Sequence, residues 1–143
     1  MKKICFLFIF IGSAFFSSSV AQQVVVYPGA VIDEKATKEA QEAALAAKSA
    51  NVHAAIYTTQ DSFQKVAEFY KTKGKEYQMP MASGSSGKPK KSDLCDGCDL
   101  WEAYFIFDGA KNLASSKLWI KVQYPYIGEE IRNITAIIVT EKK

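Results

Sequence analysis

The stretch that decides the fold is Leu100-Trp101-Glu102-Ala103-Tyr104-Phe105-Ile106-Phe107. Side chains at every second position share a face: one face carries Trp101, Ala103, Phe105 and Phe107, and the other carries Glu102, Tyr104 and Ile106. A period of two with aromatic and β-branched residues is typical of half-buried strands in antiparallel sheets. The stretch therefore predicts a strand over residues 100–107.

Two later segments have a similar composition and period. Residues 117–126 place Leu118, Ile120, Val122 and Tyr124 on one face and Trp119, Lys121 and Gln123 on the other. Residues 131–140 are rich in isoleucine, valine and threonine. The short link Gly128-Glu129-Glu130 predicts a hairpin between these two segments. Shorter strands are predicted at 24–27 and 52–58 from their β-branched and aromatic content, and a short strand limited by Pro80 is predicted at 77–81.

Two segments have the composition and spacing of helices. Residues 33–49 consist mainly of Ala, Glu, Lys and Gln, with Asp33 available as the N-cap. The apolar face of this helix is almost all alanine, so it buries little area per residue. A second helix follows Thr59 or Asp61 and ends at Gly74, with an apolar stripe formed by Phe63, Val66, Ala67 and Tyr70.

The order of these elements predicts an α+β fold, because helices come early and strands cluster late. We expect an antiparallel sheet of about four to five strands with one or two helices packed on one face. Residues 22–143 are expected to form this single domain. Residues 82–93 are rich in serine, glycine and lysine and predict a flexible polar loop within it.

Residues 1–21 resemble an export signal. Lys2 and Lys3 precede an apolar run over residues 4–16, and small residues lead to a predicted cleavage after Ala21. The run is too short for a stable membrane span, so we expect a periplasmic or secreted protein without stable membrane insertion. Cleavage lowers the net charge from +3 to +1, because it removes two lysines and no acidic residue. A nearly neutral chain argues against nucleic acid as a partner.

Cys95-Asp96-Gly97-Cys98 is the constellation with reactive potential. Outside the cytoplasm, two cysteines at this spacing are expected to form a disulfide around a tight turn. The alternative is a thiol-disulfide redox site, although a strand and not a helix is predicted to follow Cys98. Asp93, Asp96 and Asp99 also disfavour the thiolate by their negative charge.

A metal site is a third reading of the same segment. Structural zinc takes four ligands, whereas the chain after the leader has two cysteines and a single histidine, His53. The three aspartates around the cysteines do not have the spacing of a twelve-residue calcium loop. We therefore predict no metal site and no cofactor, and we assign His53 no role.

The aromatic residues of the predicted sheet suggest a binding face. Trp101, Tyr104, Trp119 and Tyr124 are the candidate ligand-binding residues, although aromatic residues at period two also form cores and cross-strand pairs. No set of nucleophile, base and oxyanion donors can be assembled. We therefore expect an exported, non-enzymatic binding domain for a protein or small-molecule ligand. The alternative is a periplasmic redox protein that uses Cys95 and Cys98.

Two segments carry a resemblance to a known group of proteins. They are Val26-Tyr27-Pro28-Gly29-Ala30 and Tyr57-Thr58-Thr59-Gln60-Asp61-Ser62-Phe63-Gln64-Lys65-Val66-Ala67-Glu68-Phe69-Tyr70. They resemble small exported bacterial domains of uncharacterised function, which begin with a Tyr-Pro-Gly-Ala turn and carry a Tyr-x-Thr-x-Asp-Ser-x-x-x-Val-x-x-Phe-Tyr segment. Residues 33–50 and the loop around Cys95 depart from that pattern. The resemblance supports the fold and implies no activity.

Overall fold

The computed structural model describes residues 24–143, so the predicted leader lies outside the described residues. The elements in chain order are β1 (Val31–Ile32), α1 (Glu34–Ala46), β2 (Val52–Thr59), α2 (Phe63–Lys71), β3 (Lys75–Tyr77), β4 (Lys90–Ser92), the 3₁₀ helix η1 (Asp93–Cys95), β5 (Cys98–Ile106), β6 (Leu118–Tyr124), β7 (Tyr126–Ile127), β8 (Ile131–Arg132) and β9 (Thr135–Lys142). The predicted α+β class is therefore confirmed.

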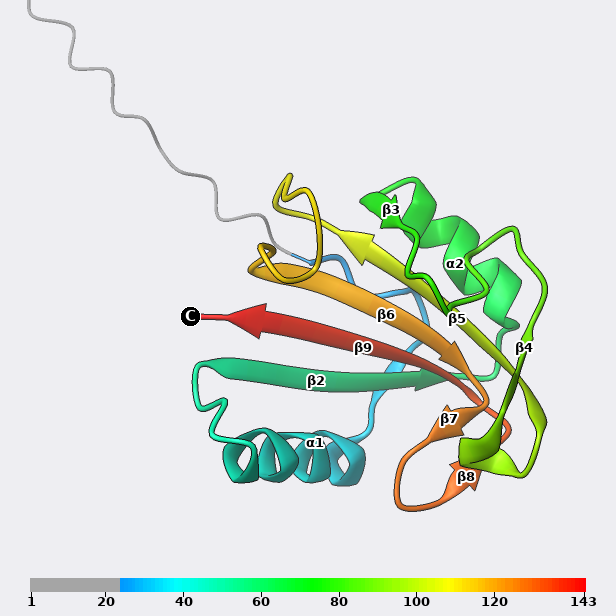
Figure 1. Cartoon of the computed structure of the whole chain (residues 1–143), viewed down its shortest axis with the longest axis horizontal. Helices are drawn as coiled ribbons and strands as arrows, with labels where there is room; N and C mark the ends of the chain where they lie inside the picture. The colour runs from blue at the N-terminus through cyan, green and yellow to red at the C-terminus, as the bar shows by residue number, and fades with distance from the viewer. Residues whose placement is uncertain (1–23) are drawn as a thin grey trace, which may run out of the picture.

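The sheet is larger than the four to five strands predicted. It has seven strands in the order β1-β2-β9-β6-β5-β3, with β4 also paired to β5, and every pairing is antiparallel (Figure 1). The short strand predicted at 77–81 is β3, which lies earlier in the chain and ends at Tyr77. The additional strands β1 and β4 are two and three residues long. Such short polar or mixed segments carry no period that a sequence pattern reveals, because backbone pairing with a neighbour forms them.

The turn at Gly128–Glu130 belongs to a small separate hairpin. The turn joins β7 to β8, which pair only with each other in the described structure. The long strands β6 and β9 lie side by side, with Val122 opposite Ile137. The sequence correctly placed a turn at this point but did not reveal that β7 and β8 leave the main sheet.

The two helices lie on opposite faces of the sheet, which corrects the prediction of helices on one face. The α2 side of the core includes Ile137 of β9 together with Phe63 and Tyr70 of α2. The next residue of β9, Ile138, packs on the other side near Ala36 and Ala40 of α1. Because successive side chains of a strand point to opposite faces, these two clusters cannot share a face.

The α2 side holds the larger core. Ser62 caps α2 by accepting a hydrogen bond from the Lys65 N–H, and Phe63, Val66, Ala67 and Tyr70 are buried, as their helical spacing predicts. The Tyr70 hydroxyl accepts a hydrogen bond from the Tyr27 N–H (3.0 Å) and donates one to the Val25 carbonyl (3.2 Å). Burial raises the pKa of Tyr70 to about 12. These bonds hold residues 24–27 against the core, where the sequence had predicted a strand.

The polar segment predicted as a flexible loop makes specific contacts along β5. The Ser83 hydroxyl donates to the Glu102 carbonyl and accepts from the Glu102 N–H, each at 2.9 Å. The Ser85 N–H and hydroxyl donate to the two carboxylate oxygens of Glu76, at 2.7 and 2.6 Å. The sequence suggested no apolar anchors here, and the structure instead uses polar ones, so residues 82–85 are all buried between the exposed Met81 and Ser86.

Candidate functional site

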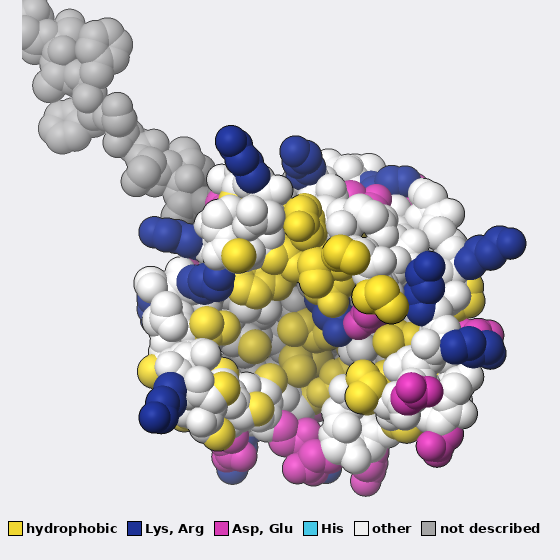
Figure 2. Space-filling view, viewed as in Figure 1, with side chains coloured by type: hydrophobic (Ala, Val, Ile, Leu, Met, Phe, Trp, Pro, Cys, Tyr) yellow, Lys and Arg dark blue, Asp and Glu magenta, His cyan; other side chains and the backbone are white. Residues whose placement is uncertain are grey.

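A groove lies on the sheet face that α1 covers only in part. We call it the α1 groove. One wall is α1 with Glu39, Ala40, Glu42 and Ala43, the floor is formed by Ile56, Lys121, Gln123 and Ile138, and the other wall is the β7–β8 hairpin with Tyr126, Ile127, Gly128 and Glu129. Its volume is about 530 Å³. Figure 2 shows hydrophobic side chains on the floor of the hollow on this face and acidic side chains along its lower rim.

The groove exists because α1 is built from small residues. Ala40 and Ala43 face the floor, and neither side chain is long enough to cover Ile56 and Ile138 and reach the hairpin. The helix is instead attached at the edge of β2 by polar groups. Thr37 accepts a hydrogen bond from the Ile56 N–H (2.9 Å), and Gln41 donates one to the Ala54 carbonyl (3.3 Å). An alanine helix fixed at one side therefore leaves apolar sheet surface open beside it.

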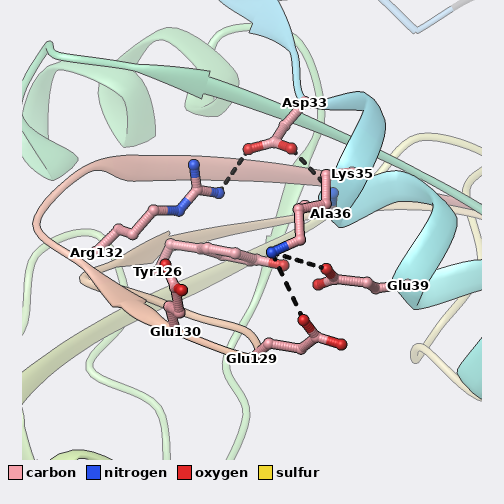
Figure 3. A pocket seen from close by; sticks show the side chains of 8 residues that line it. All are labelled: Asp33, Lys35, Ala36, Glu39, Tyr126, Glu129, Glu130 and Arg132. Atoms are coloured by element: carbon pink, nitrogen blue, oxygen red, sulfur yellow. Dashed lines mark hydrogen bonds and ion pairs between the residues drawn. The ribbon is translucent and has the colours of Figure 1, made fainter.

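A smaller pocket of about 100 Å³ adjoins the groove at the N-terminal end of α1 (Figure 3). Asp33 closes one side: one carboxylate oxygen accepts the Ala36 N–H at 2.9 Å and so caps α1, and the other is paired with the Arg132 guanidinium of β8. These two contacts outweigh burial and hold the pKa of Asp33 below its ordinary value, with the cap the largest cause. The Arg132 guanidinium also lies over the Tyr126 ring, 5.0 Å from its centre.

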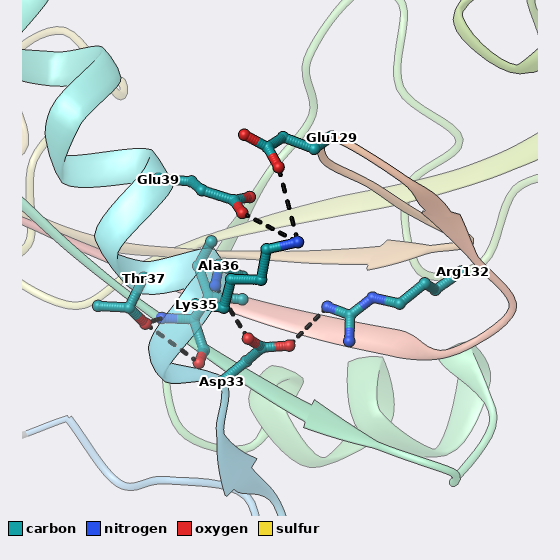
Figure 4. Close-up of polar contacts among 8 residues, drawn as sticks. Asp33, Lys35, Ala36, Thr37, Glu39, Glu129 and Arg132 are labelled. Atoms are coloured by element: carbon teal, nitrogen blue, oxygen red, sulfur yellow. Dashed lines mark hydrogen bonds and ion pairs between the residues drawn. The ribbon is translucent and has the colours of Figure 1, made fainter.

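Lys35 connects the two walls of the groove (Figure 4). Its ammonium lies 3.5 Å from a Glu39 carboxylate oxygen on α1 and 3.6 Å from one of Glu129 on the hairpin. The charges of Glu39, Glu129 and Glu130 raise the pKa of Lys35. Its side chain is 70% exposed, and exposed ion pairs of this kind contribute little to stability. The lysine can therefore move aside for a ligand at small cost.

A polar cluster lies in the otherwise apolar floor. The Lys121 ammonium is paired with the Glu102 carboxylate, and Gln123 donates a longer bond of 3.4 Å to the same carboxylate oxygen. Tyr104, a predicted ligand-binding residue, stands beside this cluster with Lys121 5.8 Å from the centre of its ring. Burial raises the pKa of Tyr104. The groove thus combines apolar surface with a few fixed polar groups, as ligand sites commonly do.

The four aromatic residues predicted as one binding face divide between the two faces of the sheet. Tyr104 and Trp119 lie on the α1 side, where the Lys142 ammonium sits 5.0 Å from the centre of a Trp119 ring. Trp101 and Tyr124 lie on the α2 side, packed against the larger core. All four are half-buried. The alternation along β5 and β6 required this division, so no single surface contains the whole set.

Trp101 and Tyr124 border a second cavity of about 310 Å³, which we call the Trp101 pocket. It lies between the end of the sheet and the start of α2, and it is lined by Gln60, Asp61, Ser62, Phe63, Gln64, Trp101, Tyr124, Asn133, Ile134 and Thr135. The Thr135 hydroxyl donates a 2.7 Å hydrogen bond to the Asp61 carbonyl, which fixes the start of β9 to the loop before α2.

The sulfur atoms of Cys95 and Cys98 lie at disulfide distance, with their Cα atoms 5.4 Å apart. Asp96 and Gly97 form the turn between them, both with positive φ. Cys95 ends η1, and Cys98 begins β5 opposite Ser92 of β4. Cys95 is buried and Cys98 half-buried. The pair therefore closes the connection between two hydrogen-bonded strands, and β5 follows it as the sequence predicted.

Within residues 24–143, no three His, Cys, Asp or Glu side chains gather into a group able to hold a metal ion. His53 is exposed on β2. Neither helix in this part of the chain has the length and apolar character needed to cross a membrane.

The residues of the α1 groove were missed at the sequence level. The alanine face of α1 indicated only that this helix buries little area per residue, and it did not reveal the open surface beside the helix. Glu129 and Arg132 come from a hairpin whose position no local pattern reveals. Comparisons of the chain with protein-family models, curated proteins and solved structures find no match. The resemblance to small exported bacterial domains therefore stays a prediction.

Proposed function

We propose that this chain is an exported binding domain that holds a ligand in the α1 groove. The observation that supports this best is an open groove of about 530 Å³ whose floor includes Ile56 and Ile138. Ligand sites are commonly clefts of roughly 300 to 1,000 Å³ with apolar walls and a few polar groups. Export rests on the character of residues 1–21, which lie outside the described residues.

The charges around the groove favour a ligand with an apolar body and an ammonium group. The groove and its adjoining pocket are lined by five carboxylates, those of Asp33, Glu39, Glu42, Glu129 and Glu130, and by three cations, those of Lys35, Lys121 and Arg132. Each cation already has a carboxylate within ion-pair distance. An anionic ligand would compete with these carboxylates, whereas an ammonium group would add to the pairing.

The test compares two ligands with the same apolar body and opposite charge. Dodecylammonium and dodecanoate, both below their micelle concentrations, are titrated into the protein by calorimetry. We expect the ammonium to bind about tenfold tighter or more, because like-charge contact disfavours dodecanoate. The Glu129→Gln variant should reduce this difference, and Glu68→Gln, on the exposed side of α2 across the sheet, should leave it unchanged.

A second pair of variants tests the location. Ala43→Leu extends a side chain into the groove and should weaken dodecylammonium binding about tenfold, because it occupies the ligand's volume. Ala46→Leu adds the same group at an exposed position of α1 that does not line the groove, and it should change nothing. Equal binding of the two amphiphiles, or indifference of binding to Ala43→Leu, would contradict the proposal.

For Cys95 and Cys98 we propose a local structural disulfide and not a redox site. The proposal is supported by the burial of Cys95 and by the pairing of Ser92 with Cys98, which puts the two sulfurs at the end of a strand pair. Redox cysteines of the Cys-x-x-Cys type draw their reactivity from the N-terminus of an α-helix. The element that follows this pair is β5.

A further inference from the structure

The Trp101 pocket contains an aromatic platform at the end of the sheet. Trp101 of β5 and Tyr124 of β6 are directly paired across the two strands, and both side chains line the pocket. The Phe63 ring lies 5.5 Å from a Trp101 ring, centre to centre, and is itself buried. Packing on Phe63 and on the neighbouring strand therefore fixes the tryptophan in place before any ligand arrives.

The polar groups around this platform are nearly all uncharged. Gln60, Gln64 and Asn133 are exposed and contribute amide groups, each of which can both donate and accept hydrogen bonds. No lysine, arginine or histidine is among the described residues that line the pocket. The pocket therefore has no cation to bind a phosphate or carboxylate group.

The one carboxylate in the pocket is already occupied. The same Asp61 oxygen accepts a 2.6 Å hydrogen bond from the Tyr27 hydroxyl and lies 2.9 Å from the Lys65 ammonium. These contacts, the Tyr27 bond first, hold the pKa of Asp61 below its ordinary value. The negative charge is balanced from outside the pocket, so it does not select a cationic ligand.

We propose that the Trp101 pocket binds a neutral saccharide. A sugar ring has an apolar face of C–H groups, which suits an aromatic platform, and hydroxyl groups at its edge that both donate and accept, which suit the amides. The volume of about 310 Å³ is large enough to admit a single hexose. This site lies across the sheet from the α1 groove and is independent of the function proposed there.

The experiment follows the indole N–H of Trp101 by NMR. The chain has two tryptophans, so Trp119→Phe leaves a single indole signal from Trp101. Glucose, galactose, mannose, N-acetylglucosamine and their disaccharides are added at millimolar concentration, with adenosine and thymidine as competing flat ligands. We expect at least one saccharide to shift the Trp101 signal in a saturable way.

Matched amide variants then locate the contact. Asn133→Ala and Gln64→Ala should each weaken saccharide binding about fivefold, the effect of one hydrogen bond. Asn51→Ala, an exposed amide before β2, should not change binding. The proposal is overturned if no saccharide shifts the Trp101 signal, if only the nucleosides do, or if the two pocket variants bind as tightly as Asn51→Ala.

Discussion

Asp33, the N-cap of α1, is paired with Arg132 of β8, which lies 99 positions further along the chain. This contact joins the helical wall of the α1 groove to its hairpin wall, and the Asp33 N–H also donates a 2.8 Å hydrogen bond to the Ile56 carbonyl in the floor. One residue therefore makes contacts with all three sides of the groove, and its two carboxylate oxygens have separable roles.

Two substitutions of Asp33 should separate the contribution of the helix cap to stability from that of the ion pair with Arg132. Asp33→Ala removes both and should lower the free energy of unfolding by about 1–2 kcal/mol, most of it from the lost cap. Asp33→Asn keeps a capping oxygen and should cost about 0.5 kcal/mol, because Arg132 is 39% exposed and its pair is weakened by solvent. Urea denaturation measures both. Equal losses in the two variants would show that the cap is not the main contribution.

The same carboxylate predicts a difference in acid stability. The pKa of Asp33 is lowered in the folded chain from its ordinary 3.8. The ionised carboxylate therefore contributes fully to the free energy of unfolding above pH 3.8, and this contribution is lost as the pH falls through the lower pKa of the folded chain. The stability advantage of the wild type over Asp33→Asn should therefore shrink on acidification below pH 3.8. Both proteins contain the same other carboxylates, so the contributions of those groups to the pH dependence cancel in this difference. A difference that stays constant to pH 2 would rule out this linkage.

The disulfide between Cys95 and Cys98 should leave no thiol that reacts with thiol reagents in the native protein, and it should stabilise the fold modestly. Titration of the purified native protein, cleaved after Ala21, should find no reactive thiol before reduction and denaturation. The double variant Cys95→Ser and Cys98→Ser should lose about 2 kcal/mol, because so short a ring restricts little of the unfolded chain. Insulin reduction by the wild type, lost in Cys95→Ser, would instead support the redox alternative.

Ser83 should control how tightly residues 82–85 hold to β5. Ser83→Ala leaves the Glu102 N–H without its 2.9 Å partner, so we expect faster hydrogen exchange at that amide and a loss of about 1–2 kcal/mol. Ser86→Ala is the control, because the Ser86 hydroxyl is exposed and accepts only from the Lys71 ammonium. Unchanged exchange at Glu102 would mean that the segment detaches freely in solution.

The long regular elements were predictable because their signals are local. The period of two in residues 100–107 places alternate residues on opposite faces, and in the structure Ala103 and Phe105 are buried on the α2 side. The capping role of Asp33 and the apolar stripe of α2 also follow from short spacings. Each of these patterns depends only on residues a few positions apart in the sequence, within one or two helical turns or one or two repeats of a strand.

The short strands and the grouping of site residues were not predictable in the same way. Lys90–Ser92 is polar throughout and becomes β4 only because the edge of β5 offers backbone partners. Likewise, nothing near Arg132 in the sequence indicates Asp33 as its partner. Trp101 and Trp119 belong to different surfaces because neighbouring strands hold their register through the whole sheet.

The sequence by itself determined the identity of the long strands, the two helices, the turn between Cys95 and Cys98 and the small side chains of α1, since propensity and periodicity act over a few neighbouring residues. The tertiary structure alone decided that β2 joins β9, that the helices lie on opposite faces, and that a hairpin stands across from α1 to form a groove. Those outcomes depend on contacts between distant segments, which form only when burial of apolar surface brings the segments together.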